Sequence, residues 1–142
     1  MPSRKARPKI TSNHVGEECK VFVRLYSGDD GESHFEDLDL PEVRVQHSAM
    51  QTAGGMTFVR LQLGRFIDWH PAPRRQYLFT LSGQIEIGVG DGSVRRLRPG
   101  DVLMVEDLTG RGHTTRASES EPTAMAIVPL TRWAPWLPTS PA

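Results

Sequence analysis

The sequence predicts an all-β domain, built as an antiparallel sandwich or barrel. Many short segments alternate apolar residues with other residues, which is the period of half-buried strands. Glycine and proline, with 13 and 11 residues, separate these segments. No long stretch keeps the period of an amphipathic helix. Together these observations favour a fold made of sheets alone.

The N-terminal half contains three expected strands, each bounded by turn or breaker residues. The first covers residues 21–26 and ends at a turn cluster over residues 27–31. A weaker alternation over residues 33–40 ends at Pro41, which breaks the pattern. The segment 56–63 alternates most clearly and follows a pair of glycines, so it is expected to form a strand.

The C-terminal half is expected to contain short strands joined by tight glycine turns. Residues 76–81 and 84–89 flank Ser82 and Gly83 and have the pattern of a β-hairpin. Later strands, separated by turns at Gly92 and Gly100 and by a loop with two glycines, are expected over residues 93–97, 102–105, 113–117 and 123–130.

The length of 142 residues fits one domain with a useful core. Residues 1–18 are polar and basic and are expected to form a flexible arm. Residues 19–130 hold the expected strands and form the single domain. In the tail, residues 131–142, the side chains of Trp133 and Trp136 require apolar cover, from the barrel or from a second subunit.

Charge and composition indicate which cellular compartment and which classes of partner to expect. Lysine and arginine together number 17, as do aspartate and glutamate, so the chain has no general attraction to nucleic acid or to anionic membranes. No apolar run is long enough to span a bilayer, and the N-terminus lacks an apolar signal-peptide core. The single cysteine, Cys19, allows no intramolecular disulfide. A cytoplasmic location is therefore expected.

Two clusters of glycine and histidine carry a resemblance to a known family. The first cluster holds Gly64, His70, Gln76 and Gly83, and the second runs from Gly100 to His113. This spacing resembles the two motifs of the cupin superfamily, in the form of its small single-domain bacterial members. The resemblance implies an antiparallel double-stranded β-helix, the jelly-roll barrel of that superfamily.

The chain departs from the family pattern at positions where the family places metal ligands. Ala72 stands where the first motif has its second histidine, and Gln76 stands where that motif has a glutamate. In the second motif, Glu106 replaces a proline and Ala117 replaces an asparagine. The metal signature is therefore incomplete, whereas the glycine and turn spacing is retained.

The first functional hypothesis is a small-molecule enzyme that contains a divalent metal. The resemblance implies that iron, manganese, nickel or zinc would be held inside the barrel by His70, Gln76 and His113. Imidazole suits these ions, but an amide oxygen is a weaker ligand than the carboxylate it replaces. His34 and Glu106 are candidates for a further ligand, because both could face the barrel interior.

The second hypothesis needs no metal. His70 and His113, with Glu106, would act as acid and base toward an organic substrate, as in an isomerase, an epimerase or a cyclase. The parity of the expected strand directs Gln76 toward the cavity and Tyr77 away from it.

The third hypothesis is a binding or sensor module without catalysis. A pocket lined by Leu78, Thr80, Val102 and Met104 would suit an apolar ligand. In all three hypotheses the partner is a small molecule, and the resemblance implies that the protein forms a homodimer.

Overall fold

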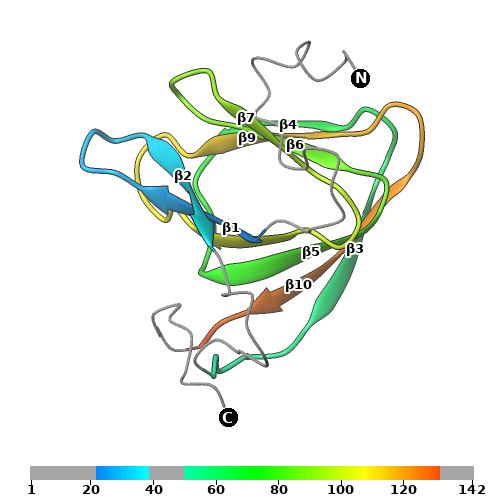
Figure 1. Ribbon diagram of the computed structural model, residues 1–142, viewed down its shortest axis with the longest axis horizontal. Coiled ribbons are helices and arrows are strands. Elements are labelled where there is room, and N and C mark those ends of the chain that lie inside the picture. Colours follow the sequence, from blue (N-terminus) through cyan, green and yellow to red (C-terminus); the bar gives the residue numbers. More distant parts are fainter. Residues whose placement is uncertain (1–21, 39–49, 132–142) are drawn as a thin grey trace, which may run out of the picture.

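Ten strands in two facing sheets make up the described part of the chain. The structure is a computed structural model that describes residues 22–38 and 50–131. Figure 1 shows the two sheets one above the other. In spatial order, the larger sheet holds β2 (Ser33–Leu38), β1 (Phe22–Ser27), β8 (Val102–Glu106), β5 (Gln76–Ser82), β10 (Thr123–Pro129) and β3 (Thr57–Leu61). The smaller sheet holds β4 (Phe66–His70), β9 (His113–Ala117), β6 (Ile85–Gly88) and β7 (Val94–Leu97).

The predicted all-β jelly-roll architecture is confirmed. Paired strands run antiparallel, except β1 and β8, which lie side by side in parallel. Strands distant in sequence are neighbours, so that β8 lies between β1 and β5. Within the two described ranges there is no helix, and hence none that is long and apolar enough to cross a membrane.

The predicted hairpin across Ser82 and Gly83 is wrong. β5 pairs with β8 and β10, whereas β6 pairs with β7 and β9, so the chain changes sheets at this turn. Gly83 has a φ of 69°, and a Cβ atom there would lie 2.6 Å from the carbonyl oxygen of Pro122. Glycine is needed here because the crossing chain passes against its neighbour.

Strand β4 is an element that the sequence pattern does not predict. Phe66 and Ile67 are adjacent apolar residues, which interrupts the alternation expected of a half-buried strand. Its neighbour β9, in contrast, has the same bounds in the structure as in the prediction.

Side chains of the larger sheet alternate between two apolar clusters. On β8, Leu103 and Val105 join the cluster between the sheets, whereas Val102 and Met104 pack with Tyr77 on the opposite face. The expectation that Val102 and Met104 line the pocket is therefore wrong. The prediction placed β8 one residue out of phase, and a shift of one residue exchanges the two faces of a strand.

Some predictions fall on residues outside the described ranges. They concern the N-terminal arm over residues 1–18, Cys19, and the tail beyond Thr131 with its residues Trp133 and Trp136. These predictions, the domain boundaries and the homodimer stay predictions.

Candidate functional site

A cavity of about 180 Å³ lies between the two sheets. Its polar side chains come from His70, Gln76, His113 and Thr115, so the structure brings together the three predicted metal ligands. Within the described part of the chain, this wall contains no aspartate, glutamate, lysine or arginine. The other lining residues are Val59, Leu61, Ile67, Ala72, Pro73, Leu78, Ile87, Leu103, Val105, Met125 and Ile127.

A β-bulge in β4 turns His70 into the cavity. The pairing of β4 with β9 shifts register between Ile67 and His70. In a regular strand these two residues would face opposite sides of the sheet, because they are an odd number of positions apart. The bulge lets both side chains line the cavity. Within it, the Asp68 carboxylate accepts a hydrogen bond of 2.8 Å from the backbone N–H of Trp69.

His113 begins β9 directly opposite His70. The two residues are register partners, their ring centroids are 4.5 Å apart, and their ring planes are inclined by 54°. Gly112 precedes His113 with a φ of 82°, and a Cβ atom there would lie 2.0 Å from the carbonyl oxygen of His70. The glycine therefore allows the close approach that brings the two rings together.

Hydrogen bonds at Nδ1 determine the tautomer of both rings. Nδ1 of His70 donates to the carbonyl oxygen of Asp68 at 2.7 Å, and Nδ1 of His113 donates to Oδ2 of Asp107 at 2.6 Å. Carbonyl and carboxylate oxygens only accept, so Nδ1 carries the proton of each neutral ring. Neither Nε2 atom has a hydrogen-bond partner within residues 22–38 and 50–131. Each neutral ring therefore keeps a lone pair on Nε2.

Asp107 is a candidate site residue that the sequence motifs do not identify. Its side chain is 0% exposed, and its Oδ2 accepts hydrogen bonds from His113 and from the Ser33 hydroxyl, the latter at 2.7 Å. Its backbone carbonyl accepts a hydrogen bond of 2.9 Å from the N–H of Ala72. Among the described residues, its Oδ1 has no partner. This carboxylate orients the His113 ring.

Gln76 contributes a hydrogen-bond donor to the cavity. Its Oε1 accepts a hydrogen bond of 3.0 Å from the guanidinium of Arg74. Arginine has donors only, which determines how the amide is oriented. The side chain of Gln76 is buried at the cavity wall, and its amide NH₂ makes no hydrogen bond to a described residue. The prediction from parity is confirmed, since Tyr77 packs on the opposite face of the sheet.

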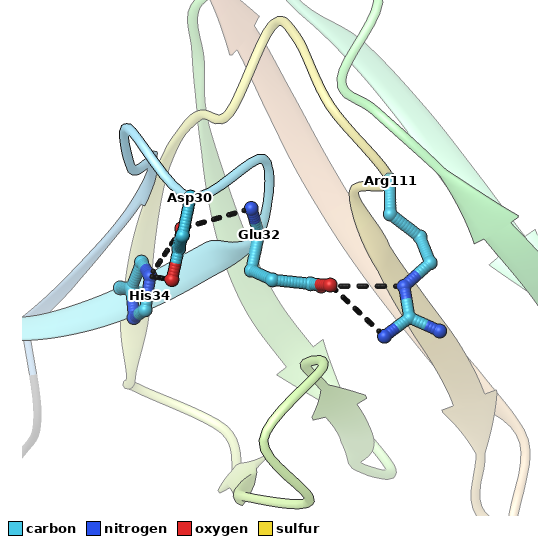
Figure 2. A network of polar contacts seen from close by, with 4 residues as sticks. All are labelled: Asp30, Glu32, His34 and Arg111. Carbon is cyan, nitrogen blue, oxygen red and sulfur yellow. Dashed lines mark hydrogen bonds and ion pairs between the residues drawn. The ribbon is translucent and has the colours of Figure 1, made fainter.

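The turn between β1 and β2 holds the loop that carries Asp107. Figure 2 shows Glu32 and Arg111 pointing toward one another, and the guanidinium donates to both carboxylate oxygens at 3.2 and 3.1 Å. The backbone N–H of Arg111 also donates to the carbonyl oxygen of Gly31 at 3.0 Å. The same guanidinium lies 4.3 Å from the ring centre of Trp69. These contacts connect the loop to the turn between β1 and β2 and to β4.

His34 belongs to this turn and not to the cavity. Figure 2 shows the His34 ring beside the Asp30 carboxylate. Its Nε2 lies 3.0 Å from each carboxylate oxygen, and this hydrogen bond lowers the pKa of the Asp30 carboxyl. Its ring also contacts the ring of Tyr26. The expectation that His34 faces the barrel interior is wrong, because the neighbouring residues Ser33 and Phe35 are the ones that turn inward.

Glu106 lies away from the two histidines that it was expected to assist. It forms ion pairs with Arg24 and with Nε of Arg75, the latter at 2.8 Å, and it does not line the cavity. Thr80 is buried but is not part of the cavity wall either.

The donors at the cavity fit a resident divalent metal poorly. Within the described ranges, no group of three or more histidine, cysteine, aspartate or glutamate residues is placed to hold an ion. His70 and His113 supply two neutral nitrogens, and the Gln76 oxygen already accepts a hydrogen bond from the cationic Arg74. No carboxylate at this wall would balance the charge of the ion, which lowers the expected affinity. Metal binding through His70, Gln76 and His113 stays a prediction from the family resemblance.

Comparisons with known proteins add similarities to solved structures. No family model matches the chain, and no curated protein matches it. A cupin domain of Cnp3 from Schizosaccharomyces pombe is 17% identical over 70% of this chain and 73% of its own, with a TM-score of 0.45. A Ralstonia eutropha protein, provisionally named a mannose-6-phosphate isomerase, is 22% identical over 64% and 91%, with a TM-score of 0.41. An RmlC-like cupin from Desulfovibrio desulfuricans is 22% identical over 68% and 98%, with a TM-score of 0.37.

Two of these three structures, those from Schizosaccharomyces pombe and Desulfovibrio desulfuricans, carry the word cupin in their names. Each match is partial and low in identity, so the strand order carries the assignment of the fold. Two facing sheets, with β8 between β1 and β5 and with the cavity between the sheets, form a jelly roll. The chain thus has an all-β jelly-roll fold.

Proposed function

We propose that the chain is a small-molecule enzyme that moves a proton within its substrate, inside the barrel, with His113 as the base. The hydrogen bond between Nδ1 of His113 and the buried Asp107 carboxylate carries this proposal. It leaves Nε2 of the neutral imidazole to accept a proton, and it stabilises the positive charge that the ring then gains.

His70 supports a proton transfer along one face of the substrate. Its ring lies beside that of His113, on the neighbouring strand of the same sheet. An epimerase with two bases needs them on opposite faces of the reacting carbon. Two rings on the same side instead favour an isomerase, in which a proton leaves one carbon and returns to another on the same face.

The proposed isomerisation needs neither an oxidant nor a reductant. Nε2 of His113 takes a proton from the carbon between a carbonyl group and a double bond. The electron pair of that C–H bond moves into the conjugated system, and negative charge develops on the carbonyl oxygen. The Gln76 amide can donate a hydrogen bond to this oxygen. The proton then returns to the far end of the system, and the double bond has moved.

Ligand binding without catalysis is the second candidate function. The apolar wall of the cavity favours it, because such a wall retains a small organic molecule whether or not the molecule reacts. In that case His70 and His113 would only accept hydrogen bonds from the ligand.

Isomerisation of a simple unsaturated ketone tests the proposed function. Cyclohex-3-enone is converted into cyclohex-2-enone by this proton shift, and ultraviolet absorbance follows the conjugated product. We expect His113→Gln to lower kcat by about 10²- to 10⁴-fold, the usual contribution of acid–base catalysis. Gln62→Leu, on the exposed surface, is the control and should match the wild type. Equal rates for the wild type and His113→Gln would refute the proposal.

A further inference from the structure

The polar groups at the cavity differ in what they can bind. Nε2 of His70 and Nε2 of His113 are acceptors in the neutral rings, because Nδ1 carries the proton in each. The amide NH₂ of Gln76 is a donor that makes no hydrogen bond to a described residue. A ligand that satisfies this set presents an acceptor to Gln76 and an acidic hydrogen to the histidines.

Arg74 strengthens the donor at Gln76. Its guanidinium donates to Oε1 of Gln76 and lies outside the cavity wall, with an exposed side chain. The positive charge polarises the amide, so that the NH₂ group donates a stronger hydrogen bond. The acceptor on the ligand is therefore expected to be an oxygen that carries partial negative charge.

The wall around these groups disfavours a charged ligand. Its side chains are apolar apart from His70, Gln76, His113 and Thr115, and it offers no cation to an anionic group. An anion would lose part of its hydration without gaining a lysine or arginine partner at this wall, which weakens its binding. An ammonium group would meet two imidazole lone pairs, but no carboxylate at this wall would balance its charge.

The size of the cavity limits the ligand to one small ring or a short chain. The cavity volume is about 180 Å³. Pockets for drug-sized ligands are larger, about 300–1,000 Å³.

From the polar groups, the uncharged wall and the size of the cavity we infer that it takes a small uncharged carbonyl compound. The carbonyl oxygen accepts a hydrogen bond from the Gln76 amide, and the hydrogen-bearing carbon next to the carbonyl lies against His70 and His113. This inference deepens the proposed function, on which it rests, by naming the substrate class. Binding can nevertheless be measured without turnover.

Three probes of equal ring size test the contribution of charge to binding. Cyclohexanone, cyclohexanecarboxylate and cyclohexylammonium are each titrated into the full chain, and NMR shifts report binding. We expect cyclohexanone to bind at least about 10-fold more tightly than either ion. Tighter or equal binding of cyclohexanecarboxylate or cyclohexylammonium would overturn the inference.

Variants of Gln76 test the hydrogen bond itself. Gln76→Leu removes the donor, and Gln76→Glu replaces it with an acceptor of the same shape. Both should weaken cyclohexanone binding by about 10-fold or more, whereas Gln62→Leu, on the exposed surface, should not. Thermal unfolding identifies any variant that fails to fold. The other Gln76 variant then tests the hydrogen bond to the ligand. Unchanged binding in a folded variant would overturn the inference.

Binding and turnover together distinguish the two proposals. If cyclohexanone binds as expected but cyclohex-3-enone is not isomerised, the proposed function fails and the ligand class stands. If the isomerisation proceeds at an equal rate in Gln76→Leu, the ligand geometry fails and the proposed function stands.

Discussion

Nδ1 of His113 donates a hydrogen bond of 2.6 Å to Oδ2 of Asp107, a carboxylate that is fully buried. The same oxygen accepts the Ser33 hydroxyl, and the backbone carbonyl of Asp107 accepts the N–H of Ala72. The carboxylate is therefore held by Ser33 of β2 and by His113, and the backbone of Asp107 is held by the segment after His70. Since its position is determined from several sides, it can orient the imidazole at the cavity.

Asp107→Asn should impair catalysis more than binding. The amide keeps the shape of the side chain but removes the charge that stabilises a protonated His113. We expect kcat for cyclohex-3-enone to fall by about 10-fold or more, with little change in KM. Glu106→Gln is the matched comparison, because Glu106 does not line the cavity. A large loss of kcat in Glu106→Gln together with an unaffected Asp107→Asn would contradict the assignment.

Gly112→Ala should destabilise the protein more than Gly92→Ala. Both glycines have positive φ, 82° and 91°, so alanine is strained by about 1 kcal/mol or more at either position. At Gly112 the new Cβ atom would also meet the carbonyl oxygen of His70 at 2.0 Å, whereas nothing lies within 4 Å at Gly92. Denaturant unfolding should show an extra loss of at least about 2 kcal/mol for Gly112→Ala. Equal losses would mean that the contact with His70 relaxes freely.

Ala72→His should create a metal site. Ala72 is buried at the cavity wall with His70 and His113, so a histidine there adds a third imidazole to the two already present. Calorimetric titration with Zn²⁺ or Ni²⁺ should show affinity at least about 10-fold higher than that of the wild type. The gain should disappear when His70 and His113 are both replaced by alanine. High affinity in the wild type would instead support the metal prediction from the family resemblance.

Alkaline pH should destabilise the wild type more than Tyr77→Phe. Burial raises the pKa of the Tyr77 phenol above its usual value of about 10. As pH rises, the unfolded chain therefore loses this proton first. The contribution of Tyr77 to stability is complete below pH about 10 and is lost as the pH climbs through the raised value. Denaturant unfolding at pH 8 and pH 11 measures the difference, with Tyr26→Phe as the control. Identical pH dependence in the wild type and Tyr77→Phe would contradict the raised pKa.

The fold could be predicted from the sequence because its signals are local. Alternation and glycine turns give most of the strands, and the bounds of β9 are correct. The partner of each strand is not a local property, which is why the turn at Gly83 was interpreted as a hairpin although it joins two sheets. The bulge that directs His70 into the cavity also has no signal in the spacing of residues along β4.

The candidate site was predicted in part, and one error of phase explains the main omission. The motif spacing identifies His70, Gln76 and His113 as site residues, and all three line the cavity. The predicted phase of β8 puts its even-numbered residues on the inner face, and Glu106 is one of them. With Leu103 and Val105 inside, the same alternation reaches Asp107. Ser33 lies far away in sequence, so its bond to Asp107 is visible only in three dimensions.

The exchange of hydrogen for deuterium in cyclohexanone tests the central claim, that His113 removes a proton from carbon. Cyclohexanone has no carbon–carbon double bond that could move. Exchange in D₂O at the carbons next to its carbonyl group therefore reports proton removal alone. The account predicts that the wild type accelerates exchange and that His113→Gln returns it to the rate in buffer. Equal acceleration by the wild type and His113→Gln, or none by either, would contradict it.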